Sequence, residues 1–170
     1  MDDGHATTTP TPSRSVVGAP QRPKLLLVCS PGGHIQDLLS LEPAWGDFDR
    51  TWVTTPAPDV EHALRGERYD LAHGPTNRNA IKLLRNFVVA FKVLRDRKPD
   101  VILSTGAAIA IPFFLLGKLS RRRLVYVECL ARVDSLSASG RAVYWLADCF
   151  FVQWPALARY RRARYEGSVL

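Results

Sequence analysis

From Lys24 onward, short apolar runs alternate with segments whose apolar residues recur every three or four positions. The apolar runs are bounded by Gly, Pro, Asp or Ser and therefore predict buried strands. The predicted strands cover residues 24–29, 50–55, 69–73, 100–104, 124–128 and 149–153. Helices are predicted at about 34–41, from 58, and at 78–96, 107–119, 140–147 and 155–164.

This alternation of strands and helices implies right-handed crossovers, so the predicted fold class is α/β, a Rossmann-like doubly wound parallel sheet. In such sheets the ligand crevice lies beyond the carboxyl ends of the strands. Candidate site residues therefore directly follow the strands, at 30–34, 54–56, 74–79, 105–107, 128–134 and 153–155.

The longest predicted helix, residues 78–96, is amphipathic. Its apolar residues form a stripe of Ile81, Leu84, Val88 and Phe91, and most of its basic residues lie elsewhere.

Residues 1–23 are rich in Thr and Pro, show no periodicity and predict a disordered tail. The remainder, residues 24–170, predicts a single domain. A chain of 170 residues is long enough for one α/β domain and too short for two full-sized ones.

The composition, with 46% hydrophobic and 23% charged residues, is that of a folded globular chain. Three cysteines at unrelated spacings predict buried thiols in a reducing compartment, and they do not form a zinc-binding pattern. No apolar run reaches the roughly 18 to 20 residues that span a bilayer, and the first residues do not resemble a signal peptide. We therefore expect a cytoplasmic location.

The net charge of +7 is unevenly distributed. Residues 78–170 carry 17 basic and 6 acidic side chains, a net charge of +11, whereas residues 24–77 carry a net charge of −4. A basic face attracts nucleic acid, anionic lipid, a pyrophosphate-bearing substrate or an acidic protein, and the charge alone does not choose among them.

The first candidate loop, Ser30-Pro-Gly-Gly-His34, joins the first strand to a helix. Gly32 and Gly33 let the backbone approach a ligand, and the free N–H groups at a helix start favour an anion. At this edge His34 is placed for general-base catalysis. The alternative is a tight turn carrying a solvated histidine.

The second candidate loop contains Thr105 and Gly106, which either bind a ligand or simply cap the following helix. That helix is apolar and includes Phe113 and Phe114. It is followed closely by three arginines, Arg121, Arg122 and Arg123. It is either a buried core helix or a membrane-contacting one whose arginines hold anionic headgroups, and we favour membrane contact.

Two further loops follow the last strands. Glu128 is predicted to face a substrate hydroxyl or to pair with Arg132. Gln153, Trp154 and Pro155 resemble an exposed edge that serves a protein partner, although Trp154 is equally compatible with a core position.

Taken together, the PGGH turn, the segment KPDVILSTGAAIAIPFFLLGKL, the run YVECLARVDSLSASGRAVYWLADCFFVQWP and the closing ARYEG resemble the bacterial PssD-type, Alg-fourteen-like polysaccharide-biosynthesis family. The resemblance covers about residues 24–170.

It implies the acceptor-binding, membrane-associated half of a split GT-B glycosyltransferase, equivalent to the N-terminal half of such an enzyme. The enzyme would be an inverting hexosyltransferase, for example an N-acetylglucosaminyl- or glucuronosyltransferase. It would move a sugar from a UDP-sugar to a lipid-linked saccharide, and this chain would be inactive without a separate donor-binding subunit.

The resemblance assigns His34 as the base. It assigns acceptor contacts to six loop residues, namely Gly32, Gly33, Thr105, Gly106, Glu128 and Arg132. It implies no cofactor and no metal, and a peripheral location on the cytoplasmic face of the plasma membrane, against an anionic surface and without nucleic acid. Two other functions remain open from the residues: a nucleotide- or nucleic-acid-binding Rossmann module, and a non-catalytic membrane scaffold.

Overall fold

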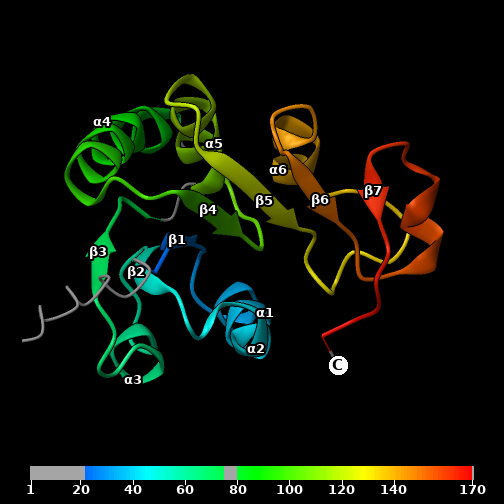
Figure 1. Cartoon of the computed structure of the whole chain (residues 1–170), viewed down its shortest axis with the longest axis horizontal. Helices are drawn as coiled ribbons and strands as arrows, with labels where there is room; N and C mark the ends of the chain where they lie inside the picture. Colours follow the sequence, from blue (N-terminus) through cyan, green and yellow to red (C-terminus); the bar gives the residue numbers. More distant parts are fainter. Residues whose placement is uncertain (1–21, 75–79, 170) are drawn as a thin grey trace, which may run out of the picture.

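The computed structural model describes residues 22–74 and 80–169, which form a seven-stranded parallel sheet with helices on both faces (Figure 1). The strand order is β3-β2-β1-β4-β5-β6-β7, and each neighbouring pair is parallel. The winding reverses between β1 and β4, as in Rossmann-type sheets. The predicted α/β fold class is confirmed.

The strands are β1 (Lys24–Val28), β2 (Asp49–Thr54), β3 (Tyr69–Leu71), β4 (Val101–Ser104), β5 (Arg123–Val127), β6 (Cys149–Phe151) and β7 (Ala163–Arg164). The helices are α1 (Gly33–Ser40), α2 (Glu42–Trp45), α3 (Val60–Ala63), α4 (Ala80–Arg97), α5 (Ala110–Leu119), α6 (Ala138–Val143) and the 3₁₀-helix η1 (Pro155–Arg159).

All six predicted strands are present, but the predicted last helix, residues 155–164, is wrong. The chain there makes only η1 and then β7, which pairs with β6 through Phe150 and Ala163. Closing the open edge of the sheet satisfies the backbone groups of β6 that a further helix would leave unpaired. Arg78, the predicted start of the long helix, and most of the predicted tail lie outside the described residues.

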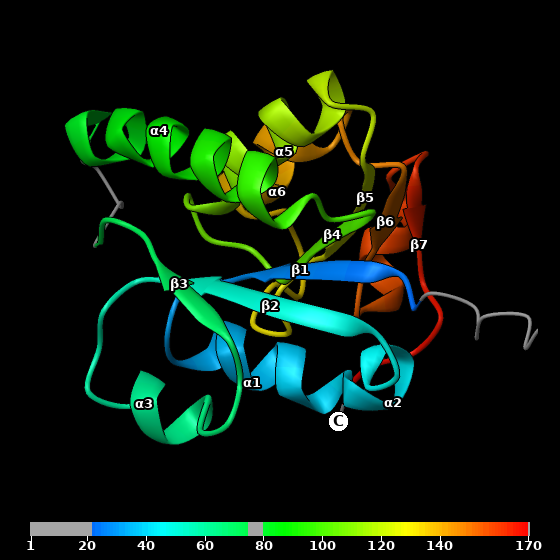
Figure 2. The ribbon, with the colours of Figure 1, turned by 60° about the vertical axis from the view of Figure 1, so that its left-hand side comes forward.

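Helices α4, α5 and α6 cover one face of the sheet, and α1, α2 and α3 lie on the other (Figures 1 and 2). Each layer buries its own apolar cluster against the sheet. On the side of α1 and α2, a groove of about 460 Å³ reaches the apolar sheet residues Leu103, Val125 and Phe151. Within the described ranges no helix is both long and apolar enough to cross a bilayer.

Helix α5 belongs to the core. Phe113 and Phe114 are fully buried, and the ring of Phe114 packs edge-on against Tyr126 of β5, with centroids 5.9 Å apart. Gly117 brings the helix down onto the sheet, because a Cβ there would lie 2.6 Å from Ile102 Cδ1. A helix that is apolar on all sides is typical of a buried position. The predicted membrane contact through Phe113 and Phe114 is therefore wrong.

The three arginines after α5 do not share one surface. Arg121 is exposed in a left-handed turn, with φ of 56°. Arg122 borders a groove between α4 and α5, whereas Arg123, the first residue of β5, borders the groove on the opposite face of the sheet. The single basic membrane patch predicted from these three residues is therefore corrected.

Helix α4 turns its apolar stripe outward. Ile81, Leu84, Val88 and Phe91 are 68%, 69%, 72% and 60% exposed. The opposite side is anchored by Asn86, which is fully buried and uses its amide twice: Nδ2 donates to the backbone oxygen of His73, and Oδ1 accepts from the His73 N–H. These bonds satisfy a polar group that burial would otherwise penalise, and they fix the rotation of the helix.

The position of α5 generates a stability prediction. Replacing Phe113 by Ala should lower the free energy of unfolding by about 3 to 5 kcal/mol, because it leaves a cavity in the core. Leu119→Ala, at the 81% exposed end of the same helix, should change it by no more than about 0.5 kcal/mol. Chemical denaturation measures both, and equal small effects would place α5 outside the core.

Candidate functional site

His34 lies in the first turn of α1, at the carboxyl edge of the sheet. The turn before it passes through Gly32, whose φ of +77° is a conformation that glycine adopts without strain. The Nδ1 atom of His34 lies 3.0 Å from the backbone oxygen of Thr105. A carbonyl oxygen only accepts, so Nδ1 carries the hydrogen, and Nε2 of the neutral ring keeps its lone pair.

The loop after β4 holds His34 from two sides. The backbone of Thr105 accepts the hydrogen bond from the His34 ring, and the Thr105 hydroxyl donates a second one to the backbone oxygen of His34, at 2.7 Å. Gly106, with φ of +127°, lies flat against the ring: a Cβ there would be 2.9 Å from His34 Cε1 and 3.1 Å from the Tyr126 hydroxyl. Thr105 and Gly106 are both buried, so they position the histidine from behind.

The crevice in front of His34 has a volume of about 730 Å³. Its walls come from the loops that follow β1, β2, β4 and β5, as the Rossmann topology predicts. The lining includes Thr55 and Arg132, which the sequence analysis placed here, and it adds Ile111 and the Ser137–Ser139 segment. Gly32 and Gly33 are exposed beside it, so they remain candidates for acceptor contact.

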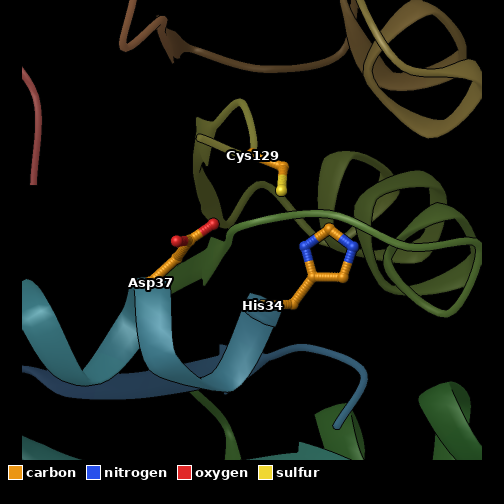
Figure 3. Close-up of side chains that lie close together, drawn as sticks. All are labelled: His34, Asp37 and Cys129. Atoms are coloured by element: carbon orange, nitrogen blue, oxygen red, sulfur yellow. The ribbon is translucent and has the colours of Figure 1, made fainter. Parts of the chain in front are cut away.

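Next to His34 lie two side chains that the sequence analysis did not assign a role, Asp37 and Cys129 (Figure 3). One potential ligand atom from each of the three residues lies within 4.8 Å of the others. Asp37 is buried, although it is charged, and accepts from the backbone N–H of Leu130 at 3.4 Å. It thereby ties α1 to the loop after β5. The i, i+3 spacing of His34 and Asp37 was the available sequence signal, because it puts both on one helix face.

A histidine, a carboxylate and a thiol are a donor set that zinc accepts. Zinc binds the thiolate, however, and burial raises the pKa of the Cys129 thiol, an effect that the neighbouring Asp37 reinforces. Cys129 is thus a protonated thiol beside the carboxylate of Asp37, close to the ring of His34. The absence of a metal remains a prediction.

Glu128 does not face the crevice. It is fully buried, and its two carboxylate oxygens accept backbone hydrogen bonds from Cys129 at 3.1 Å and from Ser137 at 3.0 Å. A Cβ on Gly140 would lie 2.2 Å from Glu128 Oε2, so the helix start reaches the carboxylate only as glycine. The predicted substrate contact or Arg132 pair is corrected: Glu128 shapes the 129–137 loop that walls the crevice.

The predicted partner edge is largely used within the chain. Gln153 is buried, donates to the backbone oxygen of Glu128 and accepts from the Val169 N–H. Trp154 is half-buried and donates its indole N–H to Leu130 O at 2.6 Å. Of the three residues, Pro155 alone is exposed, so the side chain of Gln153 is unavailable to a partner.

With this geometry described, comparison with known proteins is informative. A family model described as "Oligosaccharide biosynthesis protein Alg14 like" matches residues 73–169, more than half of the chain. The chain is also 36% identical over 180 aligned positions to the mouse (Mus musculus) "UDP-N-acetylglucosamine transferase subunit ALG14", covering 86% of this chain and 83% of that protein. The chain belongs to the Alg14-like family.

Another Alg14-like relative, from Eremothecium gossypii, is 51% identical over 75 residues, which are 41% of this chain and 34% of that protein. Among solved structures, MurG of Acinetobacter baumannii superposes with a TM-score of 0.68 at 15% identity, covering 84% of this chain. The match spans only 45% of the MurG chain, so this Alg14-like protein corresponds in fold to about half of it.

The contact between Gly106 and His34 yields a matched pair of glycine variants. Gly106→Ala should lower the free energy of unfolding by about 2 kcal/mol or more, because the residue has positive φ and its Cβ would collide with the imidazole. Gly33→Ala meets nothing within 4 Å and starts a helix, so it should be neutral or stabilising by up to about 1 kcal/mol. Thermal unfolding of the two variants measures this, and equal effects would mean that the loop does not clamp the ring.

Proposed function

We propose that this protein is the acceptor-binding and membrane-recruiting subunit of a two-component inverting glycosyltransferase, which adds a sugar from a UDP-sugar to a lipid-linked saccharide. The family membership supports it, as does the word "subunit" in the name of the mouse relative. The chain matches only 45% of the MurG chain in fold, which is consistent with a second domain that another chain supplies.

The observation that carries the proposal is the state of His34. Its Nδ1 is committed to Thr105, and its free Nε2 borders a crevice large enough for a sugar and a pyrophosphate. In an inverting transfer, Nε2 takes the proton of the acceptor hydroxyl while that oxygen forms a bond to the anomeric carbon of the donor sugar. The bond from this carbon to the nucleotide diphosphate breaks, and the diphosphate leaves with the electron pair.

We assign two roles to the partner subunit: binding of the donor nucleotide and stabilisation of the negative charge on the leaving diphosphate. On this side, the positive charge of residues 78–170 and the exposed Arg132 at the crevice suit an acceptor that carries pyrophosphate. The finer identity, a bacterial PssD-type protein acting with an N-acetylglucosaminyl or glucuronosyl donor, belongs to the same proposal and is supported by the motifs described above.

The proposal also places the chain peripherally on the cytoplasmic face of the plasma membrane. All three of its cysteines are free, including the half-buried Cys149, which suits a reducing compartment. The thiol of Cys29 is fully buried, and this burial raises its pKa to about 12. It is therefore inert toward oxidants in the folded state.

A first test removes the base. His34→Ala should reduce turnover by the reconstituted pair about 10² to 10⁴-fold, because general-base catalysis contributes this much. The assay follows transfer from the UDP-sugar to a lipid-pyrophosphate acceptor. His62→Ala, an exposed histidine on α3, is the control and should retain full turnover. Full turnover by a folded His34→Ala variant would exclude His34 from the chemistry.

A second test concerns the missing half. The isolated chain should neither transfer the sugar nor bind the UDP-sugar tightly, and adding the donor-binding subunit should restore transfer. Isothermal titration with the UDP-sugar and the same transfer assay measure these two properties. Transfer by the isolated chain would contradict the two-subunit division.

A further inference from the structure

The outward face of α4 is an exposed apolar surface. Its stripe of Ile81, Leu84, Val88 and Phe91 is more than half exposed along the helix. Burying apolar surface is the largest favourable term in folding, so a contiguous stripe left in water marks a contact surface. We call it the α4 stripe.

Basic side chains accompany the stripe. Helix α4 carries five basic residues and a single acidic one, Asp96. Arg85, Lys92 and Arg95 are exposed, and their spacing puts them on the same outward side as the stripe. This corrects the expectation that most basic residues of the helix lie away from the stripe. Arg85 and Lys92 border the stripe on one side, and an apolar helix face beside a Lys- and Arg-rich one is typical of helices that lie in the headgroup region of a membrane.

The surface continues onto the end of α5. A groove of about 430 Å³ between the two helices brings Phe91 together with Leu116 and Leu119, and Leu119 is 81% exposed. Lys98 and Arg122 line the same groove. The combined surface therefore has an apolar centre and a basic margin, drawn from two helices that pack against each other on one face of the sheet (Figure 2).

We propose that this face docks on an anionic phospholipid bilayer. The α4 stripe and Leu119 enter the boundary between headgroups and acyl chains, and Arg85, Lys92 and Lys98 contact the lipid phosphates. This deepens the proposed membrane-recruiting function and replaces the sequence-based assignment of that contact to α5.

The charge favours a bilayer over a second copy of the chain. Two copies packed through this face would oppose like charges, which disfavours the pairing. An anionic leaflet instead attracts each basic residue near its surface and accepts the apolar residues without requiring a complementary shape.

The test measures binding of the full chain to vesicles of phosphatidylcholine with 30% phosphatidylglycerol, by flotation and without any partner or sugar donor. The variant Leu84→Ser, Val88→Ser, Phe91→Ser should bind at least about 100-fold more weakly, because three apolar contacts are lost. Replacing Arg85 and Lys92 by Gln should weaken binding roughly 20- to 30-fold. Pure phosphatidylcholine vesicles or 1 M salt should weaken the wild type in the same direction.

The matched control is Tyr165→Ser, an exposed aromatic residue in the C-terminal segment, beyond β7 and away from the α4 stripe. It should bind vesicles as the wild type does. All variants should retain the thermal unfolding midpoint within a few degrees, since the replaced side chains are mostly exposed.

Unchanged vesicle binding by the folded triple-serine variant would overturn the proposal. If the triple-serine variant no longer self-associates in gel filtration, although the wild type does, and still binds vesicles, the face would be assigned to a second copy of the chain instead. Loss of complex formation with the donor-binding subunit, again with vesicle binding intact, would assign it to that subunit. Because the vesicle assay needs no sugar transfer, its outcome is independent of whether His34 is the base.

Discussion

The parallel pairing of β1 with β4 is the constraint on which the site depends. In this register Val28 lies beside Ser104, so the loops that follow the two strands leave the sheet at the same point. His34 and Thr105, which lie 71 positions apart in sequence, are thereby brought into a reciprocal pair of hydrogen bonds. Every other feature of the crevice is arranged around a histidine whose orientation these two loops set.

Buried polar contacts also hold the loop after β5, which forms the wall of the crevice opposite His34. Glu128 directly follows β5 and is fully buried, an arrangement that is stable because two backbone N–H groups donate to its carboxylate. Asp37 joins the same loop to α1 from the other side. The carboxylates of Glu128 and Asp37 therefore stabilise the 129–137 loop, and the position of Arg132 at the mouth of the crevice depends on this loop.

The sequence predicted the six main strands because each is a short apolar run bounded by residues that break regular structure. It also predicted the edge at which the site forms, because the strand-helix alternation determines the winding. It could not predict which way α4 faces: a helical wheel locates the stripe, but the rotation is set by the tertiary bonds of Asn86 to His73. Uniform hydrophobicity likewise could not separate a core position for Phe113 from a membrane position.

The roles of Glu128 and Gln153 failed for a related reason. A polar residue after a strand has the same sequence pattern whether it faces the crevice or turns inward to bind backbone groups. The difference lies in contacts such as the close approach of Glu128 to Gly140, which are twelve positions apart in sequence. The prediction of a helix after Pro155 was wrong because local sequence propensity does not show that β6 has an open edge, with which residues 163–164 pair as β7.

The same winding that builds the crevice also relates it to the α4 face. In a parallel strand-helix-strand unit, the helix starts at the carboxyl edge of the sheet, where the crevice lies, and runs back toward the other edge (Figure 2). Ile81 and Leu84, in the first part of α4, are therefore nearer to that edge than Phe91. With the proposed docking of the α4 stripe on a bilayer, the proposed lipid-linked acceptor would keep its chain in the membrane while its pyrophosphate and sugar extend as far as the rim of the crevice. The proposed membrane contact and the proposed acceptor site would thus meet at the same edge of the sheet.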